Sequence, residues 1–163
     1  MEEQLLQVIT QETYTLTRLK SRVRILKNFL IAKIFQSQEQ IDADLSAEDQ
    51  KWLSALDQNT IAQINKDNVY ELFTSIEKKI DSLPVIVMYL PFDAPEIEVA
   101  KYGTKARQNF GTSILLDIKY DPTLIAGCAL VWKGVYKDYS IKSVLKEKHD
   151  EIMSSFRETL NRY

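Results

Sequence analysis

The sequence predicts an α+β protein in which an N-terminal helical bundle precedes a small C-terminal α/β domain of order β-α-β-β-β-α. Proline and glycine are absent from the first 83 of the 163 residues, and four of each follow. These two residue types interrupt regular structure most strongly, so the first half is expected to be helical and the second to contain strands and turns. The predicted domains are 1–80 and 81–163.

Apolar residues at every third or fourth position define the helices of the first half. The pattern predicts one long helix over about 3–36, with Glu12 as an interruption. A second helix is expected from Ser46, because Ser46 and Asp49 have the spacing of a capping box with Asp in place of Glu or Gln. A third is expected over about 67–80.

The second half alternates short apolar runs with turn residues. An apolar run between Pro84 and Pro91 predicts a buried strand. Asp93-Ala-Pro-Glu96 has the cap, early proline and acidic residue of a helix start. The elements expected here are strands over 84–91, 113–120, 127–132 and 135–137, a helix over about 94–109, and a final helix from 140 to the end.

Composition argues against several kinds of site. A single cysteine, Cys128, and a single histidine, His149, leave no intramolecular disulfide and no zinc cluster built from cysteines. No apolar run approaches the roughly 20 residues of a membrane span. A net charge of −2 gives no basic excess that would indicate nucleic acid. We expect an intracellular protein that does not span a membrane and has no metal and no cofactor.

Isolated reactive residues have ordinary interpretations. His149 precedes Asp150 as an oriented base would, but its charged neighbours favour a solvated helix residue. Cys128 lies in an apolar strand, which favours a small buried side chain. The acidic residues of 42–49 lack the spacing and glycine of an EF-hand and are interpreted as surface. We expect no catalysis; the alternative is a small enzyme that uses His149 and a cleft near Asp121.

A block of basic residues is followed by a block of acidic residues. Three interpretations are open: pairing of the two blocks inside the helical bundle, a docking face for an acidic partner, and binding of nucleic acid or an anionic membrane. Pairing is favoured, and the short patch and acidic total argue against the third. The basic block comprises Arg18, Lys20, Arg22, Arg24, Lys27 and Lys33, and the acidic one Glu39, Asp42, Asp44, Glu48, Asp49 and Asp57.

The stretch from Ile118 to Ser140 resembles the C-terminal signature of the F-type ATP synthase delta subunit, called OSCP in mitochondria. That family has Asp-Pro-x-Leu-Ile-Gly-Gly, an apolar strand, a short turn, Asp-Gly-Ser and a helix. Ala126 and Tyr139 stand where the family has glycines, and the resemblance covers about 84–150. The matching residues are Asp121, Pro122, Leu124, Ile125, Gly127, Asp138 and Ser140.

Each part of the signature has a structural interpretation. Asp121-Pro122 is expected to form a turn between strands, which Leu124 and Ile125 anchor in the core. Gly127 is expected to let the chain pass close to a neighbouring backbone. Asp138 or Ser140 is placed to cap the last helix, which makes these fold residues and not catalytic ones.

The resemblance implies a non-catalytic stator subunit that links the catalytic head to the peripheral stalk of a rotary F-type ATP synthase during proton-driven ATP synthesis. The implied partners are the alpha subunits of the head and subunit b of the stalk. The implied location is the cytoplasmic face of the bacterial inner membrane, reached only through the complex. The alternative is an E-like peripheral-stalk protein of a vacuolar or archaeal-type ATPase. Candidate partner-binding residues are Arg18, Arg22, Lys27, Ile152 and Phe156.

Overall fold

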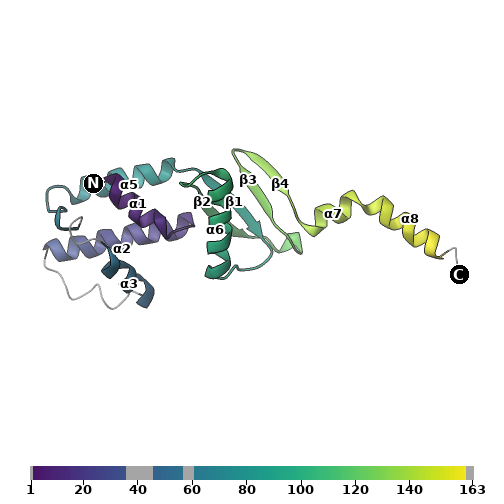
Figure 1. Ribbon diagram of the computed structural model, residues 1–163, viewed down its shortest axis with the longest axis horizontal. Helices are drawn as coiled ribbons and strands as arrows, with labels where there is room; N and C mark the ends of the chain where they lie inside the picture. Colours follow the sequence, from purple (N-terminus) through teal and green to yellow (C-terminus); the bar gives the residue numbers. More distant parts are fainter. Residues whose placement is uncertain (1, 36–45, 57–60, 161–163) are drawn as a thin grey trace. The chain divides into compact units, whose positions relative to one another are not determined.

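A computed structural model describes residues 2–35, 46–56 and 61–160, and its mixed α+β class agrees with the prediction. Helices dominate the first half, and the strands that the structure describes all lie in the second (Figure 1). The chain divides into two compact units, one of 1–84 with 103–115 and the other of 85–102 with 116–163. The predicted division into domains 1–80 and 81–163 stays a prediction.

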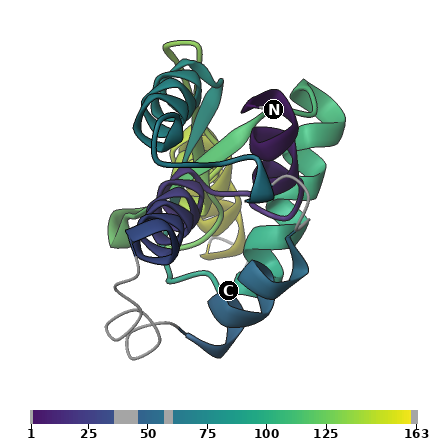
Figure 2. The same cartoon turned by 90° about the vertical axis from the view of Figure 1, so that its left-hand side faces the viewer.

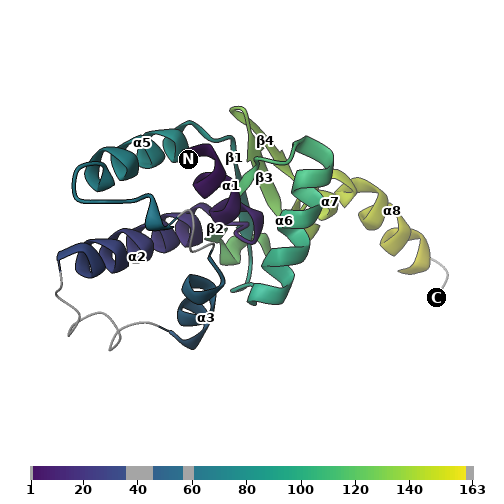
Figure 3. The ribbon, with the colours of Figure 1, turned by 60° about the vertical axis from the view of Figure 1, so that its left-hand side comes forward.

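The described elements of the first unit are mainly helices that share one apolar core. They are α1 (Glu2–Gln11), α2 (Leu16–Phe35), α3 (Ala47–Ala55) and α5 (Val69–Ser82) (Figures 2 and 3). Helices α1, α2 and α5 pack on one another. Their largest fully buried side chains are Ile9, Leu19, Leu26, Leu30, Phe73, Ile76 and Ile80.

The predicted single helix over 3–36 is wrong, because the chain breaks between α1 and α2. The Thr13 hydroxyl donates to the carbonyl of Ile9 at 2.7 Å, which closes the end of α1. Thr15 then starts α2, since its hydroxyl accepts from the backbone N–H of Arg18 at 3.2 Å. Threonine competes for backbone hydrogen bonds in this way, and the break follows directly on Glu12, where the apolar spacing is interrupted.

Arg107 of α6 (Glu96–Phe110) completes the end of α1. Its guanidinium donates to the carbonyls of Thr10 at 2.8 Å, Thr13 at 2.6 Å and Gln11 at 3.2 Å, and it lies 4.7 Å from the centre of the Tyr14 ring. The last carbonyls of a helix have no partner within the helix, so a cation there satisfies them. Burial lowers the pKa of Arg107.

The second half contains a mixed four-stranded sheet of order β2-β1-β3-β4. Strand β1 (Val85–Leu90) pairs antiparallel with β3 (Ala129–Trp132), which forms a hairpin with β4 (Val135–Asp138). Strand β2 (Leu115–Tyr120) follows α6 and lies beside β1. The final helix is two helices, α7 (Ile141–Glu147) and α8 (His149–Leu160), separated at Lys148; residues 161–163 lie outside the described part.

Replacing Arg107 by methionine should destabilise the protein by about 1–3 kcal/mol, because four carbonyls, the three near the end of α1 and that of Ile114, lose a charged donor. The check is the free energy of unfolding from urea titration. Arg24→Met, at an exposed position of α2, is the matched control and should change stability by less than about 0.5 kcal/mol. Equal effects of the two substitutions would contradict the capping role of Arg107.

Candidate functional site

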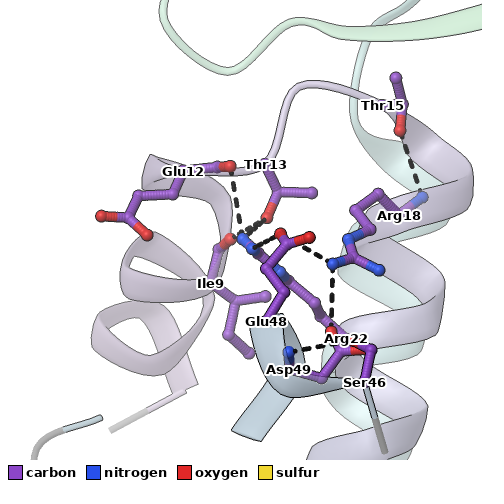
Figure 4. A network of polar contacts seen from close by, with 9 residues as sticks. All are labelled: Ile9, Glu12, Thr13, Thr15, Arg18, Arg22, Ser46, Glu48 and Asp49. Atoms are coloured by element: carbon purple, nitrogen blue, oxygen red, sulfur yellow. Dashed lines mark hydrogen bonds and ion pairs between the residues drawn. The ribbon is translucent and has the colours of Figure 1, made fainter. Parts of the chain in front are cut away.

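Two arginines of α2 meet two adjacent carboxylates of α3 in a group that we call the arginine cluster: Arg18, Arg22, Glu48 and Asp49 (Figure 4). Arg18 Nη2 lies 2.8 Å from Glu48 Oε1 and 3.2 Å from Asp49 Oδ1. Arg22 Nη2 lies 3.4 Å from the same Glu48 oxygen. Residues four apart share one helix face, so α2 presents both guanidinium groups to α3.

Arg22 is the centre of the arginine cluster. It is 5% exposed, and its Nη1 donates to the Thr13 hydroxyl at 2.8 Å and to the Glu12 carbonyl at 3.3 Å. Its guanidinium also lies 5.1 Å from the centre of the Trp52 ring. Burial, followed by the nearby charge of Arg18, lowers the pKa of Arg22, and Glu48 opposes that shift. Contacts from two segments, residues 12–13 and α3, therefore hold this side chain in one position.

Helix α3 begins as the sequence predicts. The Ser46 hydroxyl accepts from the Asp49 backbone N–H at 3.1 Å and donates to Asp49 Oδ2 at 2.7 Å. The carboxylate of Asp49 is therefore held beside the helix N-terminus, where negative charge is favoured. It points its other oxygen toward Arg18.

The favoured interpretation, pairing of the basic block with the acidic block, agrees with the structure for Arg18 and Arg22, which contact Glu48 and Asp49. Glu39, Asp42, Asp44 and Asp57 lie outside the described residues. Besides the arginine cluster, Lys27 lies 3.1 Å from Glu77 and Lys20 lies 2.8 Å from Asp81, both on α5. Arg22, a predicted partner-binding residue, is buried and not exposed, and its guanidinium takes internal partners from the Thr13 hydroxyl and the Glu12 carbonyl. Arg18 and Lys27 keep partly exposed side chains.

A groove of about 440 Å³ follows the seam between α2 and α5. The buried side chains of Val23 and Ile80 form part of its wall, and Arg24 and Asn28 stand beside it. The Lys20–Asp81 and Lys27–Glu77 pairs join its two sides. An amphipathic helix fits such a groove only if these surface ion pairs separate, which costs little.

The first part of the signature forms the predicted turn after β2. Asp121 Oδ1 accepts from the Thr123 backbone N–H at 2.9 Å and from its hydroxyl at 2.7 Å, which starts the short 3₁₀ helix η2 (Pro122–Leu124). Leu124 is buried, as predicted. The prediction that Ile125 anchors the turn is wrong, because its backbone adopts φ 65° and its side chain is 69% exposed.

The second part of the signature folds against the first, and Gly127 is the point of closest approach. A Cβ at Gly127 would lie 2.5 Å from the Tyr139 carbonyl oxygen and 2.9 Å from the Ser140 Cα. Backbone hydrogen bonds join the two parts. The Tyr139 N–H donates to the Cys128 carbonyl at 2.8 Å, and the Ile141 N–H donates to the Ala126 carbonyl at 2.9 Å. Ala126 and Tyr139 stand at glycine positions of the resemblance, and neither has a positive φ.

Asp138 and Ser140 start α7 together. Asp138 Oδ1 accepts from the Ser140 backbone N–H at 2.8 Å, and the Ser140 hydroxyl accepts from the Ser143 N–H at 3.2 Å. Hydrogen bonding of the Asp138 carboxylate to the side chain and to the backbone N–H of Ser140 lowers the pKa of Asp138. Ser140 is fully buried, so the direction in which α7 leaves the hairpin is fixed by this pair.

Helices α7 and α8 contain no buried residue. On α8 the apolar side chains recur on one side, at Ile152, Met153, Phe156 and Leu160, and we call these four residues the C-terminal stripe. The predicted partner-binding residues Ile152 and Phe156 therefore share one exposed surface. An apolar face left open on a helix is typical of a partner contact.

Residues with reactive side chains are scattered. His149 is the exposed first residue of α8, and not the middle of a helix as predicted. Cys128 is half-buried, and burial raises the pKa of its thiol, which disfavours the reactive thiolate. Within residues 2–35, 46–56 and 61–160, no three His, Cys, Asp or Glu side chains gather as a metal site would require.

Comparison with known proteins adds no assignment, since no protein-family model and no curated protein matches this chain. Among the helices that the structure describes, none has the length and apolar character needed to cross a lipid bilayer.

Replacing Gly127 by alanine should destabilise the protein by at least about 2 kcal/mol, because the new Cβ meets backbone atoms and φ is +90°. Gly134→Ala is the matched control. Its φ of +77° is also positive, but no atom lies within 4 Å of the added Cβ, so a loss of only about 1 kcal/mol is expected. Urea unfolding of both variants gives the comparison, and equal losses would contradict the close approach.

Replacing Asp138 by asparagine should lower stability at neutral pH by an amount that disappears in acid. The folded-state pKa of Asp138 is below its ordinary value of 3.8, so the charged carboxylate stabilises the fold above that value. This stability is lost as the pH falls through the lower folded-state pKa. The measurement is the free energy of unfolding of both proteins between pH 7 and pH 2; a difference that stays constant with pH would contradict it.

Proposed function

We propose that this protein is a delta-type stator subunit of a rotary F-type ATP synthase, without catalytic activity of its own. The observation that carries the proposal is the closure of the signature around Gly127. The turn at Asp121, the hairpin and the cap at Ser140 match the family's residues, and here they form one hydrogen-bonded unit. If the matching residues belonged to unrelated turns, the turn at Asp121 and the cap at Ser140 would have no reason to lie side by side.

The proposed task is mechanical. A stator holds the catalytic head against rotation of the central rotor, so it needs broad interfaces with two partners and no enclosed pocket. In this proposal the chain is a helical bundle domain followed by an α/β domain, and it belongs to the cytoplasmic face of the bacterial inner membrane through the complex alone. Proton flow is coupled to ATP synthesis elsewhere in that complex.

Two surfaces suit the two proposed partners. The groove between α2 and α5 suits a short amphipathic helix, such as the N-terminal segment of an alpha subunit of the head. The C-terminal stripe suits a long helix, such as the end of subunit b in the stalk. Lys27 lies at the first surface, and Ile152 and Phe156 lie at the second.

The vacuolar-type alternative has less support from the described helices. An E-like stalk protein also has a long N-terminal helix followed by an α/β domain with a related glycine and aspartate pattern, but its helix is usually longer than the predicted helix over 3–36 and pairs as a coiled coil. Here that segment is broken at Thr13, and α2 has 20 residues, about 30 Å. The F-type proposal is therefore preferred.

The proposal predicts which proteins co-purify with the tagged full-length chain after gentle detergent extraction of its own membranes. Alpha, beta and subunit b should be recovered together, as identified by mass spectrometry. The double substitution Ile152→Asp and Phe156→Asp should reduce subunit b at least tenfold, because burying two carboxylates in an apolar contact is unfavourable.

Ser154→Asp is the control, since it adds charge to α8 away from the C-terminal stripe and should leave recovery unchanged. Circular dichroism of the purified variants verifies that the fold is kept. Recovery of A- and B-type subunits with a coiled-coil partner would assign the chain to a vacuolar-type stalk, and recovery of neither set would contradict the stator proposal.

A further inference from the structure

The chain supplies its own acidic ligand to a pair of arginines. Glu48 and Asp49 are adjacent in sequence, and both carboxylates approach Arg18, at 2.8 and 3.2 Å (Figure 4). Glu48 also reaches Arg22 at 3.4 Å. Guanidinium groups on one helix face, opposite two consecutive carboxylates, are the arrangement by which proteins bind acidic segments.

The internal ligand fits this site incompletely. The buried Arg22 Nε has no hydrogen-bond partner among the described residues, whereas Arg18 Nη2 and Asp49 Oδ1, which also lack a hydrogen bond of good geometry, face each other in an ion pair at 3.2 Å. Arg22 is more than nine-tenths buried, so water cannot readily compensate its Nε–H. A carboxylate placed to accept from both Nε and Nη of Arg22 would bind it more completely than Glu48 does.

Arg22 is held in place by groups outside α3, because it donates to the Thr13 hydroxyl and to the Glu12 carbonyl. The ion-pair partners of the Arg18 side chain are the carboxylates of α3, and its backbone lies in the first turn of α2. The buried half of the site therefore keeps its geometry when α3 moves away, which lowers the entropic cost of binding another ligand.

Helix α3 is weakly held in comparison. It has nine residues, a length at which an isolated helix is unstable in water. The contacts that retain it are the ion pairs of the arginine cluster and the buried side chains of Trp52 and Leu53. Trp52 lies under the Arg22 guanidinium, which also reaches Glu48 at 3.4 Å, so Arg18 and Arg22 together hold the charged and aromatic side chains of α3.

We propose that Arg18 and Arg22 form a docking site for an acidic segment of a partner protein, and that α3 occupies this site as an internal competitor. The partner segment carries two consecutive carboxylates followed three residues later by an aromatic side chain, as Asp49 and Trp52 are spaced. Binding of the partner displaces α3. The inference goes beyond the stator role and holds for any complex to which the chain belongs.

An acidic peptide is favoured over other anionic ligands. A nucleic acid or a lipid surface is bound by several cations spread over an exposed patch. Here one of the two arginines is buried, the neighbouring Lys20 and Lys27 pair with α5, and the total charge is −2. The aromatic contact of Arg22 adds an apolar requirement that a free phosphate does not meet.

The first experiment measures opening of α3 in the full chain with Trp132→Phe, which leaves Trp52 as the only tryptophan. Glu48→Lys should shift the Trp52 emission to longer wavelength and raise its acrylamide quenching at least twofold, because α3 separates and exposes the ring. Glu77→Lys is the matched control, because the Glu48 and Glu77 side chains are 52% and 53% exposed and each pairs with a cation of α2. It should leave Trp52 unchanged.

The second experiment measures binding in trans. The probe is a fluorescein-labelled peptide with the sequence of residues 46–56, which contains the Glu-Asp pair and the tryptophan. The Glu48→Lys chain, and also the neutral Glu48→Gln chain, should bind it at least tenfold more tightly than the original sequence. Adding Arg18→Ser to either variant should remove the gain.

Several results would overturn the proposal. One is an unchanged Trp52 signal in Glu48→Lys, and another is equal peptide affinity of the open and original chains. Binding that survives Arg18→Ser would place the peptide elsewhere. Displacement of the peptide by inorganic phosphate, but not by chloride at equal ionic strength, would assign the site to phosphate. Peptide binding by the Glu48 variants does not depend on whether subunit b co-purifies with the chain. Either proposal can therefore fail while the other holds.

Discussion

The buried guanidinium of Arg22 is the constraint on which the helical part of the structure depends. A charge in an apolar core has to be hydrogen-bonded, and its partners come from the end of α1 and the start of α3. The same hydroxyl of Thr13 that closes α1 accepts from Arg22. The break between the first two helices and the position of α3 therefore have a common cause.

The sequence predicted elements whose determinants are local and missed those that depend on distant partners. The cap at Ser46, the strands, the turn at Asp121 and the close approach at Gly127 follow from residue type and spacing. The break at Thr13 does not, because the arginines that satisfy it come from α2 and from α6, nine and 94 residues away. The exposed side chain of Ile125 was missed because an apolar residue type by itself predicts burial.

For the candidate surfaces, the sequence predicted which apolar residues are exposed but not which basic residue is buried. Exposure of Ile152 and Phe156 agrees with an amphipathic pattern in which the apolar side has no partner within the described chain. Burial of Arg22 cannot be read from a run of alternating basic residues, since each arginine has the same local sequence signal. The acidic block that follows the basic block predicts that ion pairs form. It does not predict which arginine becomes buried.

The arginine cluster and the C-terminal stripe, two of the surfaces proposed for partners, differ in their physical basis and therefore in their expected response to salt. The arginine cluster is electrostatic, and a charged contact at a partly exposed site weakens when salt screens it over roughly 10 Å. The C-terminal stripe is apolar, and salt does not weaken apolar association. A rise in ionic strength is therefore expected to weaken the ion pairs of the arginine cluster and to leave the proposed contact on α8 in place. A joint that must stay attached under load is better served by the apolar surface, and an exchangeable contact by the charged one.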